Sequence, residues 1–223
     1  MKMEVFHRHS WDVDLGEAIR IQNELSRYAK IKDEVGKIER IAGIGIGFSL
    51  SKNKIIVSAV EFSYPDLEIL NRSFEKSNLD FPYVSGFFAF SAGPSILSIF
   101  ERSGLPDLVI FPGRGIAHLR RIGLATHMGI LLNIPTIACS RTPLWNDYKE
   151  PEKEKGSYTI YRKNKEKIGA VLRSRDNTKP IFITPGHKIT TESSIGIILK
   201  CCTKHRLPEP IRRAHILAKR YTG

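Results

Sequence analysis

The sequence predicts an α/β fold in which a mixed central sheet, an antiparallel meander plus parallel strands, is flanked by helices. Two observations carry this prediction. Apolar stretches typical of strands follow one another closely before residue 75, with the turn-like segment 51–54 between the first two, which indicates a meander. Further along, an apolar strand, a helical pattern and a second apolar strand succeed one another, as in α/β proteins with parallel strands.

The individual elements can be placed in order along the chain. Asp14-Leu15-Gly16-Glu17 has the form of an N-terminal capping box, and the apolar residues after it recur on one face of a helix that runs to about Lys30. The polar stretch 143–167 is expected to be a long loop or an excursion. Strands are expected at 41–48, 55–62, 67–74, 107–111, 135–139, 170–173 and 181–184, and helices at 94–102, 117–132, around 195–202 and at 210–221.

Composition sets the broad class of protein. The chain has 223 residues, 41% hydrophobic and 26% charged, with no internal repeat and no linker, and we expect one domain over residues 1–223. The longest apolar run, 87–100, is too short and too interrupted to span a membrane, and the N-terminus lacks the apolar core of a signal peptide. Three cysteines, two of them adjacent, fit neither a disulfide framework nor a zinc site. We therefore expect a cytoplasmic protein with no membrane partner.

The net charge of +12 is spread unevenly along the chain. From Lys200 to the end there are seven basic residues against one acid, and the segment 149–175 has nine against four. Such clusters are typical of proteins that bind polyanions, because each neutralised phosphate releases counterions. A basic surface that serves only solubility or thermal stability is the alternative. The charge favours nucleic acid as the partner.

Six motifs follow one another along the chain: IAGIGIGF (41–48), PYVSGFFAF (82–90), PDLVIFPGRGIAHLRRIGLATH (106–127), IPTIA (134–138), TPGHKITTESSI (184–195) and RLPEPIRRAH (206–215). Together they resemble the endonuclease V family, in the family's order, over about residues 14–222. The resemblance implies a ribonuclease H-like fold, in which a three-stranded meander precedes a strand, a helix and a further strand. It also implies a nuclease that recognises deaminated adenine, as inosine or deoxyinosine, and cuts the strand nearby with Mg²⁺.

Three positions where the resemblance implies metal-binding acids hold none. Gly45 stands where the family's first strand has Asp, Ala92 where the family has Glu after its aromatic stretch, and Pro112 where the family's fourth-strand loop opens with Asp. Mg²⁺ takes oxygen ligands, and carboxylates hold it while it clamps phosphate and activates water. We therefore expect no catalytic residues, no metal and no cofactor in this chain.

Other charged residues are candidates to replace the missing acids. Glu192 falls where the family often has an acid, but one carboxylate is a poor ligand set for Mg²⁺. Glu61, Glu101 and Asp107 are not expected at the strand end where an ion would lie. Arg114 brings a positive charge to the place of the metal and is expected to hold phosphate without cutting it; the alternative is an ordinary surface arginine.

The positions that touch nucleic acid in the family are largely retained. Pro82-Tyr83-Val84-Ser85 matches the family's wedge, a turn whose tyrosine pushes in beside the lesion, although its last proline has become Ser85. An aromatic ring can stack on any base, and the alternative is a tyrosine packed at the turn. Arg120 and His127 are seven apart and are expected to share a helix face, in a run with no compensating acid. The further candidate contacts are His118, Arg121, Arg141 where the family prefers Lys, Gly186, His187 and Thr190.

The glycines of the first strand resemble a dinucleotide-binding fingerprint. That motif needs a helix directly after the glycines, whereas here a second strand follows. We expect Gly43, Gly45 and Gly47 to lie where strands approach a helix, or where substrate comes close.

Three functions from different classes follow from these observations. The first is a catalytically inactive nucleic-acid-binding protein with a structural or regulatory role on RNA, favoured over DNA, or in a ribonucleoprotein such as the ribosome. The second is an active Mg²⁺-dependent endonuclease V that cuts near deoxyinosine or inosine, using Glu192 or another acid. The third is a protein-interaction scaffold. The basic charge and the loss of three acids favour the first.

Overall fold

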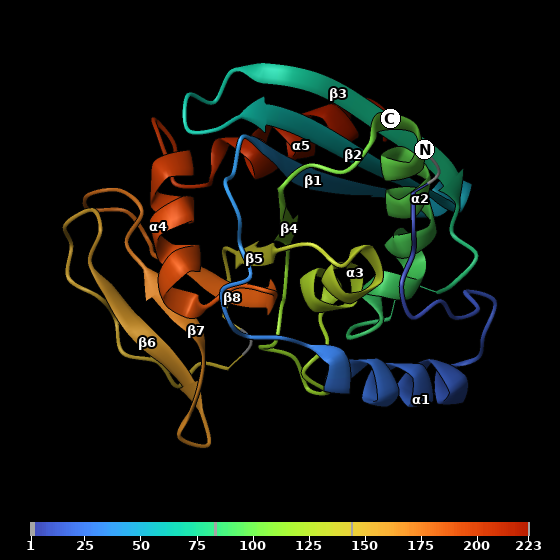
Figure 1. Cartoon of the computed structure of the whole chain (residues 1–223), viewed down its shortest axis with the longest axis horizontal. Coiled ribbons are helices and arrows are strands. Elements are labelled where there is room, and N and C mark those ends of the chain that lie inside the picture. Colours follow the sequence, from blue (N-terminus) through green and yellow to red (C-terminus); the bar gives the residue numbers. More distant parts are fainter. Residues whose placement is uncertain (1–2, 83, 144, 223) are drawn as a thin grey trace.

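The computed structural model describes residues 3–82, 84–143 and 145–222, and its centre is a sheet of eight strands within those ranges (Figure 1). Their order across the sheet is β3-β2-β1-β4-β5-β8-β7-β6. The β1–β4 and β4–β5 pairings are parallel and the other pairings are antiparallel, which confirms the predicted mixed sheet. The strands are β1 (Arg40–Ser49), β2 (Lys54–Ser63), β3 (Ile69–Asn78), β4 (Leu108–Pro112), β5 (Thr136–Ser140), β6 (Tyr158–Lys163), β7 (Glu166–Leu172) and β8 (Ile181–His187).

The predicted meander is formed by β1, β2 and β3. Asn53 adopts a left-handed conformation at the turn between β1 and β2, which suits an asparagine and allows the two strands to pair antiparallel. β3 begins at Ile69, later than predicted, because the chain still turns through Leu67, whose φ is +60°. β3 pairs only with β2 and is therefore one edge of the sheet.

Five α-helices of the described ranges cover the sheet (Figure 1). α5 and α4 contribute to the apolar core on one face, and α2 and α3 to the core on the other. α1 packs outside α3 in a smaller cluster and begins as predicted, since the Asp14 side chain accepts the Glu17 N–H. The helices are α1 (Leu15–Leu25), α2 (Phe88–Ser103), α3 (Leu124–Leu132), α4 (Thr191–Cys201) and α5 (Glu209–Arg220).

Two predicted helices have different starting points in the structure. α2 begins six residues before Pro94, which lies inside the helix. The helix predicted at 117–132 is wrong in its first half, because residues 113–123 form a loop and α3 starts only at Leu124. Gly113 and Arg121 have φ values of +93° and +59°, which a helix does not allow. The apolar residues of this segment are buried by loop packing instead.

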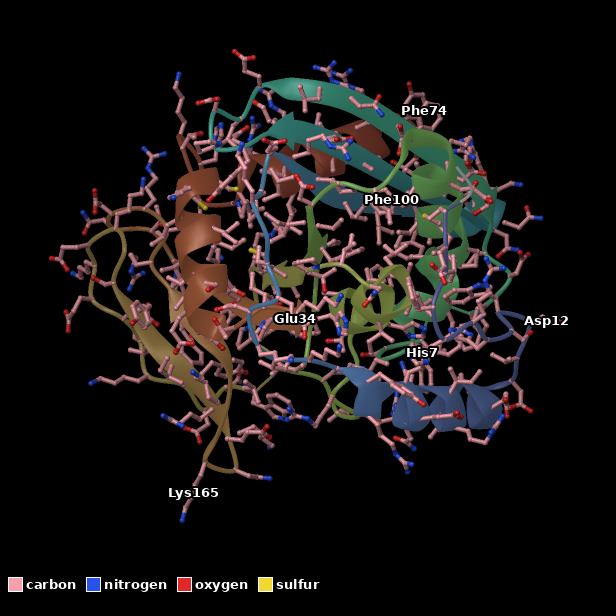
Figure 2. The ribbon with its side chains drawn as sticks, in the orientation of Figure 1. His7, Asp12, Glu34, Phe74, Phe100 and Lys165 are labelled. Atoms are coloured by element: carbon pink, nitrogen blue, oxygen red, sulfur yellow. The ribbon has the colours of Figure 1, made fainter. Side chains whose placement is uncertain are left out.

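The charged stretch predicted as a long loop or an excursion contains a strand. β6 pairs with β7 in a hairpin at the second edge of the sheet, and Figure 2 shows Lys165 at its tip. Within β6 only Tyr161 is fully buried, since an edge strand exposes much of its length to water. Its sequence therefore lacks the apolar alternation that identifies a strand.

The helices of the described ranges are too short or too polar to cross a membrane.

Candidate functional site

The glycine side of β1 lies directly against the backbone of α5. A Cβ atom added to Gly45 would lie 2.3 Å from the carbonyl carbon of Ala214, and one added to Gly43 would lie 2.1 Å from that of Pro210. Ser58 on β2 donates its hydroxyl proton to the Ala214 carbonyl oxygen at 2.7 Å. The prediction that these glycines mark the approach of strands to a helix is confirmed. An aspartate at residue 45 would displace α5.

The other two positions where the resemblance implies a metal-binding acid, residues 92 and 112, also lack a carboxylate. Ala92 is fully buried in α2, within the apolar cluster that contains Ile44 and Phe111. Pro112 ends β4, the parallel neighbour of β1. Within the described ranges, no group of three histidine, cysteine or acidic side chains could hold a metal ion. The residues present therefore do not fit Mg²⁺.

A cavity of about 350 Å³ opens where Gly45 and Pro112 meet the turn after β5. Arg141, His215 and the thiol of Cys139 are its charged or titratable side chains, and no carboxylate of the described residues lines it. Burial, followed by the positive charges of Lys219 and Arg141, lowers the pKa of His215. The cavity is lined by Ile44, Gly45, Ile46, Phe88, Pro112, Gly113, Cys139, Ser140, Arg141, Thr142, Leu207, Ile211 and His215.

The acids that could have replaced the missing ones lie outside this cavity. Glu192, in the first turn of α4, accepts a hydrogen bond from Lys167 at 2.7 Å, and this bond lowers its pKa. Glu61 pairs with Arg40 at 2.9 Å. Asp107 accepts two backbone N–H groups before β4, at the strand end opposite Pro112. Glu101 lines a different cavity, beside the N-terminal segment.

Arg114 is held beside this cavity by a neighbouring backbone oxygen. Gly113 turns the chain away from the end of β4, and the Arg114 guanidinium donates to the Thr142 carbonyl oxygen at 2.8 Å. It therefore ties its loop to the turn after β5 without lining the cavity. Arg141, on that same turn, brings the positive charge to the cavity instead.

The turn that matches the family's wedge is held by three donors to one backbone oxygen. The Gly86 carbonyl accepts from Gln22 at 2.9 Å, from His118 at 3.1 Å and from Arg120 at 3.2 Å. Arg120 also donates to the Gln22 side chain at 2.5 Å. Gln22 was missed by the sequence analysis, although a glutamine in the apolar stripe of α1 is a signal that could have identified it.

The wedge turn faces solvent at its ends. Pro82 and Ser85 are exposed and Val84 is half-buried, while Tyr83 lies outside the described residues. Leu119, in the neighbouring loop, is 71% exposed. This corner of the molecule therefore presents apolar and small polar groups on a braced backbone.

Arg120 and Arg121 do not have the surroundings predicted from their helical spacing. Arg120 lies in the loop before α3, so it does not share a helix face with His127, and its guanidinium stacks over the Phe87 ring at 4.5 Å. Arg121 pairs with Glu166 of the β6–β7 hairpin at 2.6 Å. The run itself contains no acid, as the sequence analysis noted, but the fold supplies one to Arg121 from 45 residues away.

His127 is enclosed by the N-terminal segment. It is fully buried, and its Nε2 atom shares a hydrogen bond of 2.7 Å with Nε2 of His9. The Trp11 ring stacks on it at 5.7 Å between centroids. Burial lowers the pKa of His127 well below its ordinary value. His127 therefore anchors residues 9–11 and cannot touch a bound strand in this conformation.

The candidate contacts in the loop after β8 are, like His127, held by other parts of the protein. His187 is buried and accepts the Lys30 N–H at 3.3 Å. A Cβ on Gly186 would lie 2.3 Å from the Thr136 hydroxyl, so only glycine fits there. Thr190 caps α4 and donates to Asp33. Among the candidate contacts that the structure describes, Pro82, Ser85, Arg121 and Arg141 are exposed.

Comparisons with known proteins agree with this architecture. The endonuclease V family model matches residues 20–216. Endonuclease V of Dictyoglomus thermophilum is 45% identical over 205 residues, which are 92% of this chain and 89% of that protein. The crystal structure of Bacillus subtilis endonuclease V superimposes with a TM-score of 0.91 at 28% identity, covering 97% and 96% of the two chains.

A more distant relative supports the fold. Endonuclease V of Ciona intestinalis, solved with a 23mer DNA containing an inosine, matches with a TM-score of 0.79 at 24% identity, covering 93% of this chain and 96% of that one. An α/β fold with a mixed sheet is thus shared with solved endonuclease V structures. The chain belongs to the endonuclease V family.

Proposed function

We propose that this protein binds nucleic acid without cutting it. The packing of α5 onto Gly45 carries the proposal, because it removes the space in which a metal-binding aspartate would stand. Arg141 and His215 line the adjacent cavity where carboxylates would be needed to hold a dication. Such a cavity attracts an anion and repels a metal ion.

A phosphate group is the anion that this cavity suits. A guanidinium donates two parallel hydrogen bonds to phosphate oxygens, and an imidazole with a free N–H donates a third. The nearby Arg206, which donates to the Arg141 carbonyl oxygen at 3.1 Å, adds positive charge beside it. No group in the cavity is placed to hold and activate water with a metal, so binding would end without hydrolysis.

The choice of nucleic acid as ligand draws support from the family. The Ciona intestinalis relative was solved with inosine-containing DNA, and this chain has a net charge of +12. We extend the proposal to RNA in preference to DNA, to a structural or regulatory role in a ribonucleoprotein such as the ribosome, and to a cytoplasmic location without cofactor.

A binding titration with a matched control tests the proposal. Fluorescence anisotropy of a labelled inosine-containing RNA strand would be followed against salt for the wild type, Arg141→Gln and Arg27→Gln. Arg27 is exposed at the end of the 3-10 turn after α1, and the described residues give it no ion pair. We expect Arg141→Gln to reduce the slope of log affinity against log salt by about 0.7, and Arg27→Gln to leave it unchanged. Absence of binding by the wild type would favour a protein-interaction scaffold instead.

A further inference from the structure

A second basic surface lies on the opposite side of α5, between this helix and the edge strand β3. Ile211 and His215 face the cavity at Gly45, whereas Arg213, Ile216 and Arg220 face β3. Residues 211 and 215 share one face of a helix, and residues 213, 216 and 220 share the other, as the period of 3.6 residues requires. The two surfaces are separate.

The groove on this second side has a volume of about 280 Å³. Its lining combines apolar side chains with three arginines and, among the described residues, no carboxylate. Arg213 pairs with Glu209 at 3.3 Å, while neither Arg72 nor Arg220 has an ion-pair partner within the described ranges. The groove is lined by Val60, Ile69, Arg72, Arg213, Ile216, Leu217 and Arg220.

The exposed face of β3 continues this groove along the strand. Arg72, Phe74 and Lys76 alternate on one side and are exposed, with about 6.7 Å between successive side chains. Glu75 and Ser77 point to the other side, where they bond Arg102 and Ser95 of α2. A basic, aromatic and basic side chain therefore follow one another on the α5 side of the strand.

The aromatic member of this row is part of an exposed pair. The Phe74 ring stacks on that of Tyr221 with 4.1 Å between centroids and 12° between planes. Phe74 is 43% exposed and Tyr221 is 40% exposed. Figure 2 marks Phe74 at the β3 edge of the molecule. The pair forms an apolar surface next to unpaired arginines, and both of its rings are partly exposed.

We propose that this groove binds a single strand of nucleic acid, with its phosphates on Arg72, Arg213 and Arg220 and a base stacked on the Phe74–Tyr221 pair. Exposed sheet faces with aromatic and basic residues bind unpaired bases in other proteins, because every base has a face that can stack. Charge alone would equally suit an acidic peptide; the stacked rings favour a nucleic acid. The contact goes beyond the proposed function, since it uses none of the residues at Gly45.

Anisotropy titrations with labelled oligouridine and with a duplex of the same length test the groove. Phe74→Ala should weaken single-strand binding roughly ten-fold and weaken duplex binding much less. Phe74→Tyr, which keeps an aromatic ring, should bind both ligands about as well as the wild type. Arg72→Gln combined with Arg220→Gln should reduce the salt slope by about 1.4, at about 0.7 for each lost contact. Arg27→Gln combined with Lys37→Gln removes the same charge elsewhere and should change little. Melting curves establish that each variant is folded.

The outcomes separate the groove from the proposed function. If Arg141→Gln weakens binding while the groove variants bind like the wild type, the groove assignment is overturned and the proposed function stands. If the wild type binds no single strand, both are overturned. A polyglutamate peptide at equal charge concentration is the competitor. If this peptide displaces oligouridine and Phe74→Ala does not alter the binding of the peptide, the groove is a peptide site instead.

Discussion

Gly45 on β1 and Ala214 on α5 are in backbone contact, so close that a single added carbon atom on Gly45 would lie 2.3 Å from the Ala214 carbonyl carbon. The contact explains two features of the molecule together. It allows α5 to bury its apolar face on the meander, and it leaves no room for a longer side chain at residue 45. The packing of α5 and the small size of the residue at position 45 therefore have the same structural basis.

This contact predicts that Gly45→Ala destabilises the protein. The added methyl group must push α5 away from β1, at a cost of about 1–3 kcal/mol, and Gly45→Asp should cost more. Gly196→Ala, in α4, is the matched control because nothing lies within 4 Å of its added Cβ. Chemical denaturation of the three variants measures the difference. If Gly45→Ala were as stable as the wild type, α5 would have to move away from β1 at no cost in stability, which would contradict this prediction.

The buried histidines predict that acid destabilises the fold. Burial lowers the pKa of His118 to about 4, with a contribution from Arg120, and burial also lowers that of His187 to about 4. Between these values and 6.5 the unfolded chain binds more protons than the folded one, so stability falls as the pH decreases from 7 to 5. Unfolding curves across this range provide the measurement.

A control isolates one of these histidines. His118→Gln keeps a donor for the Gly86 carbonyl oxygen but removes the titrating group. The variant should lose part of the pH dependence, by at most about 1.4 kcal/mol per pH unit. An identical pH dependence in the wild type and the variant would contradict the assignment of this effect to His118.

The network at the Gly86 carbonyl oxygen predicts a positioning role for Gln22. Gln22→Ala removes its hydrogen bonds to Gly86 and Arg120 and should lower the free energy of unfolding by about 1–3 kcal/mol. It should also weaken single-strand binding without changing the salt slope, because Gln22 carries no charge. Asn23→Ala, at the exposed neighbouring position, should do neither. If Gln22→Ala also reduced the salt slope, the substitution would have removed phosphate contacts, which would contradict a purely positioning role.

Arg120 should behave differently from Arg141. Its guanidinium is already bonded to Gln22 and Gly86 and stacked on Phe87. Arg120→Ala is therefore expected to lower the melting temperature more than it lowers the salt slope, and Arg141→Gln the reverse. Paired melting and salt titrations of the two variants distinguish them. The assignment fails if Arg120→Ala melts like the wild type but loses a full phosphate contact.

The sequence predicted the elements whose burial leaves a local pattern. β4 and β5 are short apolar runs, and both lie within one residue of their predicted positions. The capping of α1 by Asp14 was also evident from neighbouring residues. The segment 117–123 was misread as helix because its buried residues Ala117 and Ile122 lead directly into the apolar residues of α3, although packing of a loop buries them.

The contacts that define the site could not be predicted in the same way. Glu166 reaches Arg121 only because the β6–β7 hairpin folds back beside the loop, and Gln22 reaches Gly86 across 64 residues. The close approach of α5 to β1 was foreseen from the spaced glycines, but the helix that makes it lies 169 residues after Gly45, at Ala214. Long-range pairings of this kind depend on the tertiary fold and leave no periodic signal.

A cleavage measurement tests directly whether the protein binds nucleic acid without cutting it. Inosine-containing RNA and DNA would be incubated with purified wild type and Glu192→Ala in Mg²⁺ or Mn²⁺, with binding measured on the same samples. We expect both proteins to bind the strands and neither to produce a cut. Metal-dependent cutting by the wild type that disappears in Glu192→Ala would contradict this expectation and identify the protein as an active endonuclease.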